Sequence, residues 1–236
     1  MKAILMAAGR GTRISRYIGD IPKCTLDICG ETLINHTIKM LLNNDIDVHV
    51  ILGYKKEIIK QHLEGLPVIY HYNPFYDVTN SIASLWFARE FFGSEDVLLA
   101  NADVYWEEDI LSVLKKESKN PVMLVDSSRV DEGDYFFKYE DDILINHGKD
   151  LKYEDISGEY VGIAKIGLDF QNVFLQRLES MIDQQQHSLW WENVLYSFIG
   201  EESIYVRDVK DFFWSEVDYI EDYNRIINHR RKLLSC

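Results

Sequence analysis

The sequence predicts an α/β protein with a Rossmann-like, mostly parallel sheet flanked by helices. In the first half of the chain, short apolar runs rich in β-branched residues alternate with segments whose apolar residues recur at helical spacing. Strands that are apolar on both faces and separated by helices are typical of a parallel sheet covered on both sides. The length of 236 residues is sufficient to bury one large core.

The elements of the first half follow from these patterns. In the helix predicted at 33–42, for example, Ile34, Ile38 and Leu41 share one face. The strands are predicted at 2–6, 48–52, 68–70, 97–100 and 122–125, and the helices at 33–42, 55–63, 81–92 and 107–116. Ligands bind beyond the carboxyl ends of such strands, so the loops at 7–23, 73–81 and 101–106 are expected on one rim.

The second half has a different character. A hairpin is predicted from strands 135–139 and 143–146 around the polar turn 140–142, followed by a strand at 159–166. Further on, helices are predicted around 174–182 and at 189–199, strands at 203–207 and 213–217, and a closing helix at 219–232. No linker or repeat is evident. We therefore expect a single domain over 1–236, with a nucleotide-binding core (1–130) and a small β-rich, acceptor-binding lid with the closing helix (131–236).

Composition excludes several classes of protein. The net charge of -14 argues against nucleic-acid binding and against anionic membrane surfaces. No apolar stretch approaches the roughly 18 residues of a membrane span, and the N-terminal apolar run is too short for a signal peptide. Cys24, Cys29 and Cys236 are odd in number and lack metal-like spacing, which favours a cytoplasmic protein. Cys24 is interpreted as a buried filler rather than a nucleophile.

The N-terminal segment 1–23 predicts an anion-binding loop. A buried strand leads directly into Gly9 and Gly11, which permit positive φ and close approach of backbone N–H groups to a ligand. The basic residues of this stretch are Arg10, Arg13, Arg16 and Lys23, against the single acid Asp20. This local reversal of sign on an acidic chain indicates a highly anionic ligand such as a nucleoside triphosphate.

Two common phosphate-binding motifs, the dinucleotide fingerprint and the Walker A loop, do not match this loop. The dinucleotide fingerprint fails because Ile14 occupies the third glycine position, and no Gly-Lys-Ser/Thr closes a Walker A loop. A tight turn with solvated arginines remains the structural alternative.

Two carboxylates are candidate magnesium ligands. Asp103 directly follows a buried strand and is expected at the same rim as the glycine loop, where a hard cation would meet both carboxylate and phosphate oxygens. Asp218 ends an alternating acidic strand, with Glu216 on the same face. Either aspartate could instead be a helix cap, and whether Glu216 also binds metal is left open.

The motifs together resemble those of nucleotidyltransferases that activate phosphorylated sugars and alcohols. The resemblance rests on the stretch 7–13 (Ala-Ala-Gly-Arg-Gly-Thr-Arg) followed by Pro22-Lys23, on Asp103, on the stretch 158–162 and on the stretch 214–218. Over nearly the whole chain it is similar to small bacterial cytidylyltransferases that act on phosphocholine and aminoethylphosphonate. The resemblance implies the nucleotide-diphospho-sugar transferase fold and Mg²⁺-dependent transfer of CMP from CTP, by a monomer or homodimer.

The resemblance also implies roles for individual residues. Arg13, Lys23 and Lys149 would be catalytic by neutralising the reacting phosphates. Asp103 and Asp218 would bind the metal. The nucleotide would be bound by Leu5, Ala7, Ala8, Gly9, Gly11, Thr12, Arg13, Lys23, Asn80, Ser81, Ser84 and Asp103. One departure is Arg10, which stands where the family usually has an apolar residue.

Aromatic and acidic residues of the second half suggest the acceptor site. Rings with nearby acids suit a quaternary ammonium or primary amine through cation–π contact and ion pairing. The candidates are Tyr135, Glu159, Trp190, Trp191, Glu192 and Trp214. Most of these rings could instead belong to the core, and aromatic residues also stack on sugars.

The expected acceptor is therefore a small phosphate or phosphonate such as phosphocholine, phosphoethanolamine or 2-aminoethylphosphonate. One alternative is a sugar-1-phosphate nucleotidylyltransferase using UTP or dTTP. Another is a non-catalytic nucleotide-binding protein, against which the presence of Lys23, Asp103 and Asp218 argues.

Overall fold

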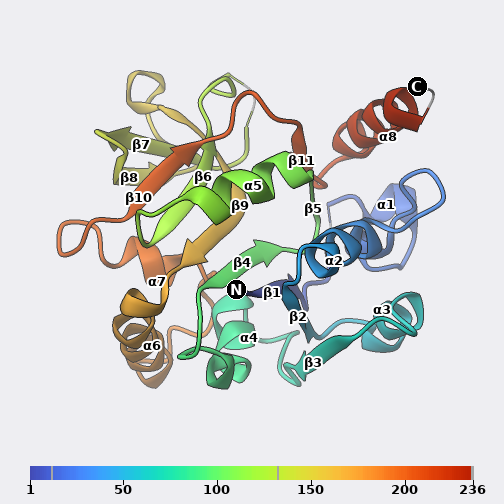
Figure 1. The fold of residues 1–236 in the computed structure, drawn as a ribbon, viewed down its shortest axis with the longest axis horizontal. Helices are drawn as coiled ribbons and strands as arrows, with labels where there is room; N and C mark the ends of the chain where they lie inside the picture. The colour runs from blue at the N-terminus through green and yellow to red at the C-terminus, as the bar shows by residue number, and fades with distance from the viewer. Residues whose placement is uncertain (12, 132, 235–236) are drawn as a thin grey trace.

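A computed structural model describes residues 1–11, 13–131 and 133–234 and confirms the α/β class (Figure 1). A nine-stranded sheet has the order β3-β2-β1-β4-β9-β6-β10-β8-β7, and β11 and β5 form a second, two-stranded sheet. The strands are β1 (Lys2–Ala7), β2 (Asp47–Leu52), β3 (Val68–Tyr72), β4 (Val97–Asn101), β5 (Val104–Trp106), β6 (Val122–Asp126), β7 (Phe136–Glu140), β8 (Ile143–Gly148), β9 (Gly158–Ile166), β10 (Tyr205–Asp208) and β11 (Trp214–Glu216).

The helices lie mainly between these strands. The α-helices are α1 (Ser15–Ile18), α2 (Leu33–Asn43), α3 (Lys56–His62), α4 (Ser81–Phe87), α5 (Glu108–Lys116), α6 (Leu168–Asp183), α7 (Asn193–Tyr196) and α8 (Ile220–Leu234). Three short 3-10 helices are η1 (Lys23–Thr25), η2 (Arg89–Phe91) and η3 (Tyr153–Asp155).

The sheet is parallel in its first half and mixed in its second. β1 pairs parallel with β2 and β4, and β2 pairs parallel with β3. β9 then lies antiparallel between β4 and β6, and every one of its residues is buried. β10, β8 and β7 continue the same sheet, so the second half of the chain shares its hydrogen-bonded framework with the first half.

Both faces of the sheet are covered, as the apolar strands predicted. Alternate residues of β1 point to opposite sides: Leu5 packs into the cluster that contains α2, α3 and α5, whereas Ile4 packs toward α4, α6 and α7. A third cluster joins Ile226 of α8 to Ile14 of the N-terminal loop and Tyr105 of β5. Figure 1 accordingly shows the C-terminal helix α8 beside the N-terminal α1 and α2.

The segment 101–106 differs from the expected rim loop because its second half is the strand β5. Ser215 of β11 pairs with Tyr105 of β5 in an antiparallel arrangement. The backbone N–H of Val217 also donates to the carbonyl of Asp103, at 2.9 Å. This pairing brings the acidic C-terminal strand directly beside Asp103.

Two predicted helices are shorter in the structure. The helix expected at 81–92 ends as α4 at Phe87 and continues as the 3-10 helix η2, a common tightening at helix ends. The helix expected at 189–199 is reduced to α7. The cause is a tertiary contact. The carbonyls of His187 and Leu189 accept hydrogen bonds from the backbone N–H groups of Asn80 and Ile82, at the start of α4.

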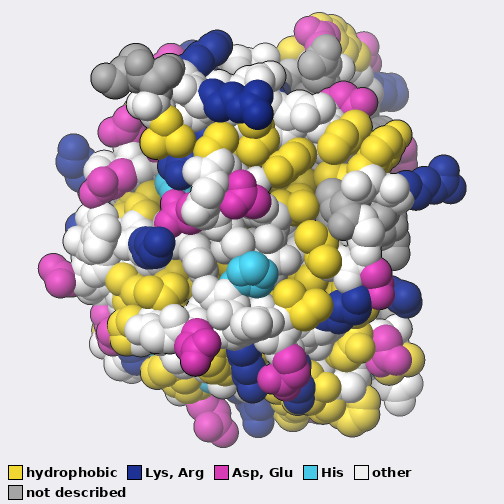
Figure 2. All heavy atoms as spheres, turned by 90° about the vertical axis from the view of Figure 1, so that its right-hand side faces the viewer, with side chains coloured by type: hydrophobic (Ala, Val, Ile, Leu, Met, Phe, Trp, Pro, Cys, Tyr) yellow, Lys and Arg dark blue, Asp and Glu magenta, His cyan; other side chains and the backbone are white. Residues whose placement is uncertain are grey.

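The surface carries both signs of charge. On the face shown in Figure 2, Lys and Arg side chains are interspersed with Asp and Glu and form no continuous basic area. Within the described part of the chain, no helix has the length and apolar character needed to cross a bilayer.

Candidate active site

A cavity of about 290 Å³ opens beyond the carboxyl ends of β1 and β4. All three loops that the sequence placed on one rim contribute to its wall, which confirms their common position. The cavity is lined by Met6, Ala8, Gly9, Arg13, Tyr76, Thr79, Asn80, Ser81, Ser84, Asn101, Asp103, Asp134, Tyr135, Lys149, Tyr160, Trp190, Glu192, Tyr196, Glu216 and Asp218.

The glycine loop shapes the entrance to a smaller adjoining hollow. Gly11 has φ +60°, and a Cβ at this position would lie 2.6 Å from Cγ of Lys23. Gly11 therefore permits both the turn and the packing of the Lys23 stem against the loop. Gly9 differs from the expectation, since it is not in the left-handed region and no atom lies within 4 Å of its ideal Cβ position. Its missing side chain keeps the cavity wall open.

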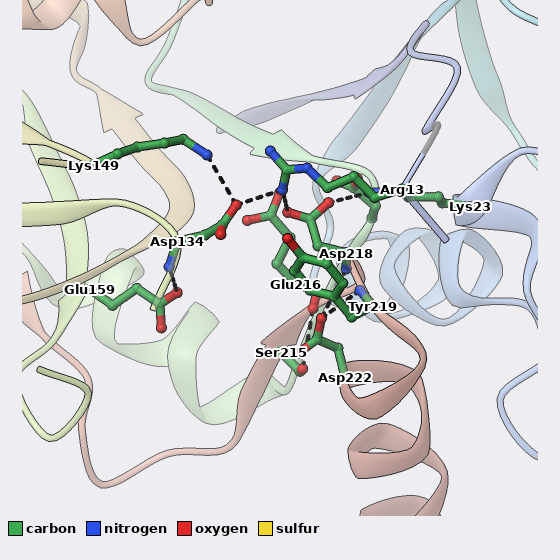
Figure 3. Close-up of polar contacts among 11 residues, drawn as sticks. Arg13, Lys23, Asp134, Lys149, Glu159, Ser215, Glu216, Asp218, Tyr219 and Asp222 are labelled. Atoms are coloured by element: carbon green, nitrogen blue, oxygen red, sulfur yellow. Dashed lines mark hydrogen bonds and ion pairs between the residues drawn. The ribbon is translucent and has the colours of Figure 1, made fainter. Parts of the chain in front are cut away.

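Lys23 lies between the two predicted metal ligands. Its Nζ is 3.4 Å from Oδ2 of Asp103 and also donates to Oδ1 of Asp218 (Figure 3). The side chain is only 10% exposed. Burial alone would lower the pKa of Lys23, but Asp103 and Asp218 outweigh it and raise the pKa above its ordinary value. Lys23 is therefore a permanent cation in the smaller hollow that adjoins the cavity.

Arg13 and Lys149 extend this charge network across the cavity. Arg13 Nη1 donates to Asp218 and lies 2.5 Å from Oδ2 of Asp134. Lys149 Nζ lies 3.1 Å from the same Asp134 oxygen. Figure 3 shows Asp134 between Lys149 and Arg13, and Asp218 between Arg13 and Lys23. The three proposed phosphate-neutralising cations are thus brought together, each held by carboxylates.

The backbone of Asp218 is fixed at the start of α8. The carboxylate of Asp222 accepts from the backbone N–H groups of Asp218 and Tyr219, at 3.1 and 2.8 Å. Among the described residues, the side chain of Asp218 binds Arg13 and Lys23 rather than the backbone N–H groups at the start of α8. The neighbouring Glu216 is partly buried and lines the cavity, and burial together with Asp103 and Asp218 raises its pKa well above the ordinary value.

The donor set at this end of the cavity fits a magnesium ion. Asp103 and Asp218 bind the same ammonium group, so their oxygens are close enough to share one cation. The described residues include no group of three or more His, Cys, Asp or Glu arranged as a metal cage. Mg²⁺ often uses one or two carboxylates and completes its shell with water and phosphate oxygens, which matches two aspartates beside an anion-binding loop.

The opposite end of the cavity is aromatic. The ring of Tyr135 contacts Trp190 edge-on with centroids 5.5 Å apart and stacks on Tyr196 at 5.8 Å. The Lys149 ammonium lies 5.8 Å from the centroid of Trp190. The hydroxyl of Tyr160 is buried and has no hydrogen-bond partner among the described residues. This wall offers ring faces and one free hydroxyl to a ligand.

Glu192 supplies a buried acid beside this wall. Burial raises the pKa of Glu192 to about 7, although the hydrogen bond from Asn101 opposes the shift. The Asn101 amide donates to Glu192 Oε1 at 3.2 Å and accepts from the indole N–H of Trp191 at 2.9 Å. Asn101 therefore links the end of β4 to the acceptor side of the cavity.

Several predicted residues do not line the cavity. The side chain of Leu5 lies in the core, and Ala7, Gly11 and Lys23 line the smaller adjoining hollow. Trp191 is buried against Asn101, and Trp214 is buried with its indole N–H on Asp126. Glu159 lies behind the wall, where it pairs with Arg129 at 2.9 Å. Thr12 is outside the described residues.

Six lining residues were not assigned from the sequence: Met6, Tyr76, Asn101, Asp134, Tyr160 and Tyr196. Asn101 is two residues before Asp103, and its place at a strand end could have identified it. Asp134 and Tyr196 stand in segments with no recognised motif. Cys24, by contrast, is buried as expected, and burial raises the pKa of its thiol to about 12, which rules out a thiolate nucleophile.

Comparison with known proteins identifies the N-terminal part of the chain. Residues 3–151 match the model of the MobA-like NTP transferase domain. The chain is 28% identical over 238 residues to the choline-phosphate cytidylyltransferase of Streptococcus pneumoniae, covering 96% of each chain. It is 23% identical to the CTP:phosphoglutamine cytidylyltransferase of Campylobacter jejuni, covering 94% of this chain and 97% of that protein.

Solved structures share the fold. The CTP:phosphocholine cytidylyltransferase of Streptococcus pneumoniae superposes with a TM-score of 0.78 at 21% identity, covering 96% of this chain and 97% of that one. The inositol-1-phosphate CTP transferase of T. maritima superposes with a TM-score of 0.76 at 18% identity, covering 98% and 96%. These likenesses confirm the nucleotide-diphospho-sugar transferase type of fold.

Proposed function

Because the chain belongs to the family of proteins with a MobA-like NTP transferase domain, and is thus a nucleotidyltransferase, we propose that it transfers CMP from CTP to a small phosphorylated or phosphonate acceptor. Pyrophosphate is the second product. The acceptor carries a positively charged amino or quaternary ammonium group, as in phosphocholine, phosphoethanolamine or 2-aminoethylphosphonate. The cytidylyltransferase names of the two full-length relatives support this choice of nucleotide.

One observation carries the proposal: a single cavity joins an anion-binding end to an aromatic and acidic end. Arg13, Asp103 and Asp218 lie at the first end, with Lys23 directly behind them. Trp190 and Glu192 lie at the second. A molecule with a phosphate at one terminus and an ammonium at the other is complementary to the two ends of this cavity.

The reaction requires no general base. A phosphate or phosphonate oxygen is already anionic near neutral pH and attacks the α-phosphorus of CTP in line, as the bond to the pyrophosphate oxygen breaks. The main obstacle is repulsion between two anions, so positioning and charge neutralisation provide the catalysis. This assigns the chemistry to Arg13, Lys23 and Lys149 rather than to a nucleophilic side chain.

Each cation has a distinct position for this task. Lys23 lies beside the glycine loop, Arg13 lies at the mouth, and Lys149 approaches from the aromatic side. Asp103 and Asp218 would hold Mg²⁺, which supplies further charge neutralisation on the phosphates when bound. Asn80, Ser81 and Ser84, which line the cavity, would contact the base.

Competition between nucleotides tests the proposed donor. Isothermal calorimetry with Mg²⁺ should show CTP binding at least about tenfold more tightly than UTP, dTTP, GTP or ATP, since a base pocket discriminates through its polar contacts. Tighter binding of UTP or dTTP would move the protein to the sugar-1-phosphate nucleotidylyltransferases. Absence of binding by all five would contradict the assignment of the loop.

A further inference from the structure

Asp134 connects the two sides of the cavity in this structure. One carboxylate oxygen accepts from Arg13 Nη1 at 2.5 Å and from Lys149 Nζ at 3.1 Å. Arg13 belongs to the N-terminal glycine loop, whereas Lys149 directly follows β8 of the second half. As Figure 3 shows, Asp134 lies between Arg13 and Lys149, two of the three cations that the proposed reaction assigns to phosphate groups.

The position of Asp134 is fixed by the protein behind it. Its backbone N–H donates to Oε1 of Glu159 at 3.0 Å, and Glu159 is in turn paired with Arg129 at 2.9 Å. A Cβ at the preceding Gly133 would lie 2.7 Å from the ring of Phe136 and 2.9 Å from Glu159, so the chain passes close to β9 here. The backbone that carries the Asp134 side chain is therefore held at the cavity wall.

The ion pairs of Asp134 can be exchanged at low cost. The side chains of Arg13, Lys149 and Asp134 are 41%, 39% and 38% exposed. Ion pairs at this level of exposure are weak, and a triphosphate offers each cation a stronger partner. Binding of CTP would then leave Asp134 without a cation.

An unpaired Asp134 would need a new positive partner. Four other acids already line the cavity: Asp103, Glu192, Glu216 and Asp218. Beside Asp134 lie the rings of Tyr135 and Trp190, where the ammonium end of the acceptor is proposed to bind. Without its cations, Asp134 would add to the negative potential of these acids, which favours a positively charged ligand group at this place.

We propose that Asp134 determines acceptor specificity by exchanging partners: CTP takes Arg13 and Lys149 from it, and the freed carboxylate binds the positively charged group of the acceptor. This inference rests on the proposed function. It adds a selection rule, because an acceptor with a neutral tail leaves Asp134 unpaired. It also sets an order, in which CTP binding prepares the acceptor site.

The substitution Asp134→Asn tests the exchange. It removes the competitor for Arg13 and Lys149, so the dissociation constant for CTP should fall about threefold or more. The KM for phosphocholine should rise about tenfold, because a charged hydrogen-bonding partner is lost. The KM for glycerol phosphate, which has a neutral tail, should stay the same or fall. Asp134→Ala should behave alike, which excludes an effect of the introduced amide.

Asp150→Asn is the matched control. Asp150 is exposed and adjacent to Lys149 in sequence but does not line the cavity. Its replacement changes the net charge by the same amount as Asp134→Asn but leaves the proposed exchange of partners intact. Its CTP affinity and acceptor preference should match those of the wild type. Unchanged CTP affinity in both Asp134 variants, or equal shifts in KM for the two acceptors, would overturn the proposal.

Calorimetry separates this inference from the proposed function. If the wild type transferred CMP to none of phosphocholine, phosphoethanolamine and 2-aminoethylphosphonate, the proposed function would fail. The proposed exchange of partners would still be tested by the CTP dissociation constants of wild type and variants. A second test is whether phosphocholine binds more tightly to the CTP-loaded protein than to the free protein. No difference between loaded and free protein would contradict it.

Discussion

Lys23 shows how much of the site is readable at the scale of single residues. Lys23, Arg13, Asp103 and Asp218 were predicted because each follows a motif or a strand end, and the structure joins all four in one network. Asp134 was missed because it lies in a loop without periodicity or motif. Trp191 and Trp214 were assigned to the acceptor from residue type alone, and type does not reveal which way a ring faces.

Replacing Lys23 tests the catalytic network. Lys23→Ala should lower kcat/KM by about 10²-fold, the typical cost of losing one preorganised electrostatic group. Pyrophosphate release measures the rate, and thermal unfolding checks that the protein remains folded. Lys39→Ala, which removes an exposed lysine paired with Glu31, should keep wild-type activity. Near-normal turnover by folded Lys23→Ala would remove Lys23 from the mechanism.

The pH dependence of acceptor binding tests Glu192. Burial raises the pKa of Glu192 to about 7, so its carboxylate becomes mostly ionised as the pH rises from 6 to 8. The KM for phosphocholine should fall over this interval by up to about tenfold, following the ionised fraction. The KM for glycerol phosphate, measured over the same pH range, corrects for the effect of ionisation of the acceptor's phosphate group.

Glu192→Gln completes this experiment. The variant has no carboxylate to ionise, so its KM for phosphocholine should change with pH only as the KM for glycerol phosphate does. An unaltered pH profile in the variant would show that Glu192 does not contact the cation.

At the scale of elements, long periodic segments were predictable and short, paired ones were not. The patterns of α2, α5 and β9 depend on many residues and gave nearly correct bounds. β5 has three residues, and its partner β11 lies more than 100 positions later in the chain. No local sequence pattern predicts such a pairing. The pairing nevertheless places Asp218 beside Asp103.

Two histidines on the paired strands β2 and β3 should make the stability of the folded protein sensitive to acid. His49 of β2 and His71 of β3 share a hydrogen bond of 3.1 Å, and Phe91 packs against both rings. Burial and the neighbouring His71 lower the pKa of His49 to about 4, against about 6.5 in an unfolded chain. The unfolded chain therefore takes up a proton first as the pH falls.

The stability contributed by neutral His49 is complete above about pH 6.5 and is lost as the pH falls toward 4. Between pH 7.5 and 5, urea unfolding should show wild type losing about 1 to 2 kcal/mol more than His49→Gln. His62→Gln, at the exposed end of α3, should lose as much as wild type. Equal losses in wild type and His49→Gln would contradict the role of this pair.

At the scale of the whole molecule, the sequence predicted the α/β class and the common rim but not the continuity of the sheet. A lid on a nucleotide-binding core was expected from the change of pattern near residue 131. In the structure β9 lies in the centre of the sheet, and β10, β8 and β7 extend it. Strand order depends on pairing between distant segments, which no local pattern encodes. As a consequence, the two halves that line the cavity share one sheet.

The most direct test of the account is pyrophosphate release with Mg²⁺, measured for CTP, UTP, dTTP, GTP and ATP against a panel of acceptors. The panel contains phosphocholine, phosphoethanolamine, 2-aminoethylphosphonate, glycerol phosphate and a set of sugar 1-phosphates. The account predicts release with CTP and an ammonium-bearing acceptor, and little with the other pairs. Release only with UTP or dTTP and a sugar 1-phosphate would contradict it.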